Sequence, residues 1–142
     1  MTLDKLYIDE AVRIRKTYLT NLAAIVEKED EIQVYFKQIE DIRKQVEDSE
    51  PTNPDEFFVK RLMEINSSIE KIKNVIMPHY DKIQKLDESQ KLLYNNIKDK
   101  YPSITDQEIQ EQIVPYIIPV DQAFTKKNKE LYDKVMEKQN KF

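Results

Sequence analysis

Residues 58–97 read FVKRLMEINSSIEKIKNVIMPHYDKIQKLDESQKLLYNNI, and this stretch decides the fold. Alternate steps of four and three residues along it define one series of positions: Phe58, Leu62, Ile65, Ile69, Ile72, Ile76, His79, Ile83, Leu86, Gln90, Leu93 and Ile97. All of these except His79 and Gln90 are large and apolar. Such a sustained heptad predicts a long helix packed lengthwise against another helix. The series keeps its phase through Pro78, so we expect one helix over 54–100 that is kinked near Pro78.

A second amphipathic stripe precedes this helix. Its apolar residues recur every three or four positions, or every seven where one position is polar: Ile8, Ala11, Tyr18, Leu22, Ile25, Ile32, Phe36, Ile39, Ile42 and Val46. The stripe predicts a helix over 3–48. In the short connector that follows, Asn53 is typical of an N-cap and Pro54 of a first helical position. Two long helices joined in this way favour an antiparallel, coiled-coil-like hairpin.

A third helix has a clear beginning. Thr105 and Glu108 have the spacing of a capping box, and Ile104 and Ile109 occupy the two positions of a hydrophobic staple. We therefore expect a helix over 105–139.

Two prolines interrupt that third helix. Pro115 and Pro119 each remove a backbone hydrogen bond, at a cost of about 3 kcal/mol inside a helix. The sequence thus predicts a helix that is bent or broken near 114–120. The complete expectation is one all-α domain over 1–142: a long antiparallel hairpin plus a proline-bent third helix, arranged as an elongated three-helix bundle.

The composition excludes several kinds of site. The chain has 142 residues with no Gly and no Cys, and 35% of its residues are charged. Phosphate-binding loops and dinucleotide folds need Gly where the backbone approaches a phosphate. Without Cys there are no disulfides, iron–sulfur clusters or Cys-ligated zinc. Interspersed charges of both signs suit long helices with solvated outer faces.

No set of residues forms a recognisable catalytic, cofactor or metal site, so we expect a protein that is not an enzyme. His79 is the one histidine, and the serines lack the base and orienting acid of a catalytic triad. His79 has a functional interpretation as a proton carrier or pH switch. We favour a structural one, in which its ring bonds a backbone carbonyl freed by the kink at Pro78.

Polar residues within the apolar stripes form a candidate polar seam. Arg15 and Glu29 interrupt the first stripe, and His79 and Gln90 interrupt the second. Arg15 and Glu29 have two interpretations. They either pair with polar residues of a facing helix and fix the register, or lie at the edge of the stripe and reach solvent through their long stems. A register role for Gln90 is also proposed.

A candidate protein-docking patch follows from the prolines. A bend or break near 114–120 would expose Tyr116, Ile117 and Ile118, and exposed apolar groups of this kind mark interaction surfaces.

Charge is distributed unevenly along the chain. Residues 1–50 carry a net charge of −4 and residues 122–142 a net charge of +3. The acidic first helix, with its run over 27–31, and the basic tail are expected to attract each other within one molecule or between molecules. Nucleic-acid binding by the tail is the weakest hypothesis, because the whole chain is acidic and has no nucleic-acid motif.

These observations predict a non-enzymatic structural or assembly protein that acts through helix–helix contacts. The scarcity of Ala and Gly and abundance of Ile suggest an AT-rich gene, as in many phages, so a component or scaffold of a phage-like particle fits. The alternative is a small acidic regulator or inhibitor of one enzyme or nucleic-acid machine. We expect protein partners, and the apolar stripes are also compatible with a homo-oligomer. The longest apolar block, 113–120, is too short for a membrane span, and no signal peptide is recognisable. The expected location is cytoplasmic or within an intracellularly assembled particle.

Overall fold

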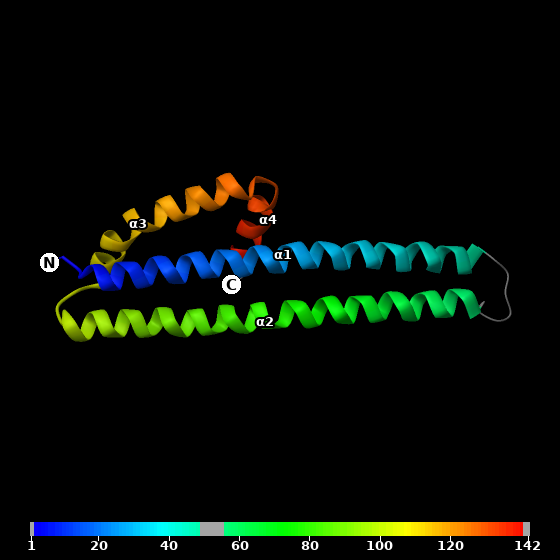
Figure 1. The fold of residues 1–142 in the computed structure, drawn as a ribbon, viewed down its shortest axis with the longest axis horizontal. Coiled ribbons are helices and arrows are strands. Elements are labelled where there is room, and N and C mark those ends of the chain that lie inside the picture. The colour runs from blue at the N-terminus through cyan, green and yellow to red at the C-terminus, as the bar shows by residue number, and fades with distance from the viewer. Residues whose placement is uncertain (1, 49–55, 141–142) are drawn as a thin grey trace.

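The structure is a computed structural model that describes residues 2–48 and 56–140. These residues form four α-helices and no strand: α1 (Lys5–Asp48), α2 (Glu56–Lys100), α3 (Asp106–Lys127) and α4 (Lys129–Asn140). The predicted all-α class is therefore confirmed. Figure 1 shows α1 and α2 side by side and antiparallel, with α3 and α4 lying over the N-terminal half of α1.

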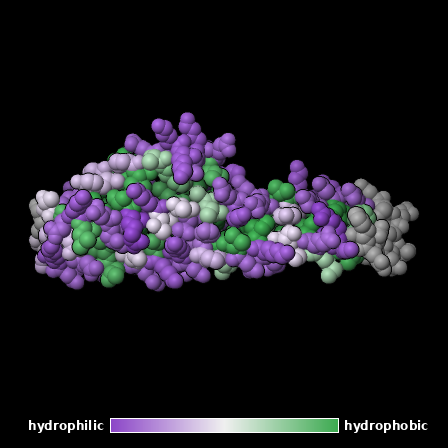
Figure 2. Space-filling view, in the orientation of Figure 1, coloured by the Kyte–Doolittle hydropathy of each residue, from purple (hydrophilic) through white to green (hydrophobic). Residues whose placement is uncertain are grey.

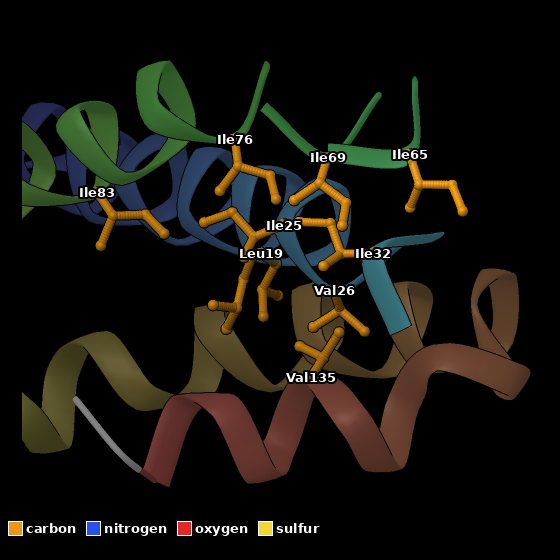
Figure 3. Packing of buried hydrophobic residues seen from close by; sticks show 10 residues of the cluster. Leu19, Ile25, Val26, Ile32, Ile65, Ile69, Ile76, Ile83 and Val135 are labelled. Atoms are coloured by element: carbon orange, nitrogen blue, oxygen red, sulfur yellow. The ribbon is translucent and has the colours of Figure 1, made fainter. Parts of the chain in front are cut away.

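α1 is the central helix, because it packs against α2, α3 and α4. It does so with two rows of buried side chains. In Figure 3, Ile25 lies near Ile69 of α2, whereas Val26 points toward Val135 of α4. Ile25 and Val135 have no exposed surface. The sequence stripe contained the row that faces α2 but omitted Val26, which lies in the second row.

The buried side chains form two clusters. One lies in the middle of α1 and joins α1, α2 and α4, with Ile25, Ile69 and Val135 among its members. The other lies near the chain's N-terminal end, where Leu3, Ile97 and Ile109 belong to one cluster with residues of α1. Each cluster thus fixes at least three segments that are far apart in the sequence.

The start of α3 confirms the predicted capping box. The Thr105 hydroxyl accepts a hydrogen bond from the Glu108 backbone N–H at 3.2 Å, and the Glu108 carboxylate accepts one from the Thr105 N–H at 3.3 Å. Ile104 and Ile109 on either side are both buried. The other predicted cap, Asn53, lies outside the described residues.

The third helix, predicted to be bent or broken near 114–120, is not broken there. α3 continues through Pro115 and Pro119, and the helical structure stops at Asn128 instead. Both prolines and Glu111 are exposed, so water can satisfy the carbonyls of Glu111 and Pro115 that lose their helical donors. Asn128 has φ −125° and ψ 44°, and its side-chain amide donates to the Phe124 carbonyl at 3.1 Å. Asn favours such local bonds outside a helix.

Two bends remain predictions. α2 contains Pro78 within a continuous helix, as α3 contains its two prolines. Neither helix is broken at a proline, and a bend without a break at these positions stays a prediction.

The distal part of the helix pair stands free of α3 and α4. We call residues 32–48 of α1 with residues 56–72 of α2 the arm (Figure 1). Ile65, midway along the α2 part of the arm, is buried, whereas Ile39, Ile42 and Leu62 are only half-buried. Two helices alone cannot enclose the seam between them, which leaves apolar surface on the arm. Figure 2 shows hydrophobic side chains among the hydrophilic ones along much of the molecule's length.

The central position of α1 gives a first prediction. Leu22 has no exposed surface and Leu6 is 75% exposed, and both lie in α1. Leu22→Ala should lower the free energy of unfolding by about 2–5 kcal/mol, because it removes buried atoms and leaves a cavity. Leu6→Ala, the same change on the same helix, should stay within about 0.5 kcal/mol of the parent. Urea unfolding followed by circular dichroism measures both, and equal losses would contradict this placement of α1.

Candidate functional site

An open cleft of about 1020 Å³ lies between α2 and α3, with α1 as its floor. It exists because both helices rest on α1 without packing extensively against each other along their described lengths. The α2 wall extends from Met77 to Tyr94, about 25 Å at the rise of an α-helix. We refer to this space as the cleft.

The interior of the cleft is mainly apolar. Its floor and lower walls include buried side chains from three helices, among them Ile14, Leu86 and Ile113. Two exposed apolar residues stand higher on opposite walls: Met77 of α2 and Val114 of α3, which are 55% and 42% exposed. Apolar side chains that line a concave surface and remain open to water are typical of binding sites.

One end of the cleft is bridged by a hydrogen bond to Tyr94. The Gln110 side-chain amide of α3 donates to the Tyr94 hydroxyl of α2 at 3.0 Å. Gln90, one of the predicted seam residues, lines the cleft on the same helix as Tyr94. Burial raises the pKa of Tyr94 above its ordinary value, so the hydroxyl stays protonated at neutral pH.

Arg15 lies at the other end. Its Nε donates to Asp121 Oδ1 at 2.8 Å and its Nη2 donates to Asp121 Oδ2 at 3.1 Å, a two-pronged ion pair between α1 and α3. The same Nη2 donates to the Gln139 side-chain carbonyl of α4 at 3.4 Å. The guanidinium carbon also lies 5.7 Å from the centre of the Tyr18 ring. Arg15 therefore connects three helices.

Glu29 is the centre of a second polar cluster. Its Oε1 accepts hydrogen bonds from the Tyr80 hydroxyl of α2 and from Lys138 Nζ of α4, each at 2.8 Å. Burial raises the pKa of Tyr80. Burial also disfavours the charged form of Lys138, but its hydrogen bonds to Glu29 and Tyr80 outweigh that effect and raise its pKa.

His79 bonds a side chain, not the freed backbone carbonyl that the sequence suggested. Its Nδ1 lies 2.8 Å from Asn21 Oδ1 of α1. Asn21 donates through Nδ2 to the Thr17 carbonyl at 2.7 Å, so Oδ1 is the acceptor and His79 Nδ1 carries the hydrogen. Asn21 is 6% exposed, the one buried polar side chain among the described residues. Sequence reasoning missed it, because its partner lies on another helix.

The structure places the three residues of the predicted docking patch on different sides of α3. Tyr116 and Ile118 are 53% and 49% exposed. Ile117 is half-buried against the core and lines the cleft together with Val114, which the sequence analysis did not single out. Ile117 and Ile118 therefore face different surroundings.

Charge attraction between the acidic first helix and the basic tail occurs within the molecule. Lys134 Nζ of α4 donates to Asp30 Oδ2 of α1 at 2.6 Å, beside the bond from Lys138 to Glu29. The tail lysines at 126, 127 and 129 are exposed.

Within residues 2–48 and 56–140, no group of three or more His, Cys, Asp or Glu side chains is placed to hold a metal ion. None of the helices described for this chain has the combination of length and apolar content that a membrane span needs.

No protein family, curated protein or solved structure matched the chain when it was compared with them.

The contact between Asn21 and His79 gives a second prediction. Asn21→Leu and His79→Leu should each lower the free energy of unfolding by about 1–3 kcal/mol, because each leaves a polar partner unsatisfied. The double variant should lose less than the sum of the two. As a control, Asn66→Leu on the exposed face of α2 should combine additively with His79→Leu. Urea unfolding measures all five variants. Additive losses for Asn21 and His79 would contradict the contact.

Alkaline pH should loosen α4. Because the pKa of Lys138 is raised in the folded state, its contribution to stability is present below about pH 10.4 and is lost as pH rises through the folded-state pKa. The raised pKa of Tyr80 acts in the same direction, since ionisation at high pH opposes folding.

The expected loss of stability at alkaline pH gives a third prediction. The urea midpoint of the parent should fall between about pH 9 and pH 11.5, and Lys138→Met should show a smaller fall. Lys129→Met, which removes an exposed lysine at the start of the same helix, should keep the full fall. If the urea midpoint of Lys138→Met falls as far as that of the parent, the cluster at Glu29 does not hold α4.

Proposed function

We propose that the chain is a non-enzymatic interaction protein that binds an amphipathic helix of a partner protein in the cleft. The observation that carries this proposal is the open, apolar-floored space of about 1020 Å³ between α2 and α3. Its wall of about 25 Å corresponds to roughly 17 residues of helix. A helix laid there contacts α1, α2 and α3 together, in the manner of other grooves that receive amphipathic helices.

The polar groups of the cleft support binding over catalysis. Arg15 is engaged by Asp121, and Tyr94 is engaged by Gln110. Burial raises the pKa of Tyr18, Tyr80 and Tyr94, which disfavours their use as bases at neutral pH. Groups that bind each other at the two ends fix the positions of the walls and leave the apolar centre free to receive a ligand.

The proposal also includes coiled-coil-like packing of the long helices and bends at the prolines. The heptads of α1 and α2 support coiled-coil-like packing in an elongated bundle, and the prolines support bends at Pro78 and between Pro115 and Pro119. The arm adds a long projecting surface with half-buried Ile39 and Leu62. A cleft on one half and an arm on the other suit a structural or assembly component that links parts of a larger particle, such as a phage-like one.

The alternative, a small acidic regulator, rests on the acidic run of α1. Two of its carboxylates, Glu29 and Asp30, already bind lysines of α4. A basic partner would have to displace α4 before it could use them. We therefore favour the helix-binding role, with α4 as the element that a competing basic partner would release.

A selection experiment tests the proposed function. A displayed library of amphipathic helices of about 18 residues, with Leu, Ile, Val or Met in the stripe and Lys, Glu, Gln or Ser at its edges, is selected on the intact protein. Recovered helices should bind Val114→Asp about tenfold or more weakly than the parent, because a carboxylate then lies on the apolar wall.

Ile118→Asp is the matched control. Ile118 is as exposed as Val114 and lies on the same helix, but it does not line the cleft. Binding that is lost in Ile118→Asp and kept in Val114→Asp would move the site to the outer face of α3. Circular dichroism should show unchanged helicity in both variants, since both residues are exposed.

A further inference from the structure

We infer that the helix bound in the cleft is basic along one edge, the edge that meets α2, and uncharged along the edge that meets α3. This inference rests on the proposed function, because it names the chemistry of the partner for the same cleft. It follows from the way the chain binds its own α4 and from the unequal charges of the two walls.

α4 provides an internal example of helix recognition by this fold. Val135 sits at the centre of its contact with α1 and has no exposed surface (Figure 3). At the edges of that contact, Lys134 donates to Asp30 at 2.6 Å and Lys138 donates to Glu29 at 2.8 Å. The helix is thus held by an apolar centre and by lysines that meet carboxylates beside it.

The α2 wall of the cleft repeats this chemistry without a lysine-bearing helix against it. Asp81 and Asp87 line the cleft beside its apolar floor. Asp81 makes no ion pair with any residue in the described ranges 2–48 and 56–140. Asp87 has Lys91 Nζ at 3.3 Å, but both side chains are well exposed, at 68% and 75%, so this pair is worth little and exchanges easily. The two carboxylates are about 9 Å apart along α2.

The α3 wall differs. Its one carboxylate in the cleft, Asp121, is occupied by the Arg15 guanidinium through two hydrogen bonds. The remaining α3 residues that line the cleft include Gln110 and Val114, which are uncharged. A second cation placed there would meet a neutralised pair, whereas a cation on the α2 side would meet two carboxylates.

The spacing of Asp81 and Asp87 determines where the partner helix carries its basic residues. Two basic residues seven positions apart lie on one edge of a helix and span about 10.5 Å, which is close to the axial separation of Asp81 and Asp87. An acidic edge in the same place would bring like charges together and would be rejected. The occupant is therefore an amphipathic helix of a partner protein with Lys or Arg on one edge.

The library described above tests this inference through the charges that it returns. Cleft-dependent helices should be enriched in Lys on one edge. A recovered Lys-edged helix should bind Asp81→Lys about tenfold more weakly than the parent, and its counterpart with Glu at the same positions should bind that variant better than it binds the parent. Asp99→Lys, an exposed position of α2 outside the cleft, is the control and should change neither affinity. Added salt should weaken the Lys-edged helix.

The outcomes separate the two proposals. Helices that require Val114 but show no Lys preference, or no response to Asp81→Lys, overturn the basic-edge inference and leave the helix-binding function standing. A library that yields no helix sensitive to Val114→Asp overturns both. The remaining occupant, a second copy of this chain, is tested by light scattering. A dimer of the parent that Val114→Asp dissociates would overturn the assignment of the cleft to a different protein.

Discussion

The whole arrangement depends on the burial of two faces of α1. A helix that presents one apolar stripe needs one neighbour, but α1 carries Ile25 toward α2 and Val26 toward α4. Both rows must leave water, so α2 and the α3–α4 segment take separate positions around α1. The cleft is a direct consequence, because two elements that each pack on α1 need not meet each other. Disrupting α1 would therefore remove the cleft together with the core.

Polar contacts then fix how the helices are placed around that core. Asn21 with His79 links α1 to α2, Arg15 with Asp121 links α1 to α3, and Glu29 with Lys138 links α1 to α4. Each joins groups that would be costly to leave unpaired in a partly buried place. Apolar contacts tolerate sliding of one helix along another more readily than these bonds do. The first two links thus set the positions of the walls that define the cleft, and the third sets the position of α4.

α4 connects stability with binding. It reaches the end of the cleft through Gln139, and it covers carboxylates of α1 through Lys134 and Lys138. Conditions that neutralise Lys138 should loosen both the core around Val135 and the Arg15 end of the cleft. An element of twelve residues that is held by one buried side chain and a few ion pairs is well placed to respond to a partner.

The sequence by itself determined the local features. The heptad of residues 58–97 predicted α2, and Thr105 with Glu108 predicted the start of α3, because a helical repeat and a cap depend on residues within a few positions of each other. It also singled out Arg15, Glu29 and His79 as polar positions in apolar stripes, but not their partners. Tertiary structure alone decided the Asn21–His79 contact, the continuation of α3 through Pro115 and the existence of the cleft. These depend on how helices rotate about one another and on which carbonyls face water, and both are set by contacts between residues far apart in the chain.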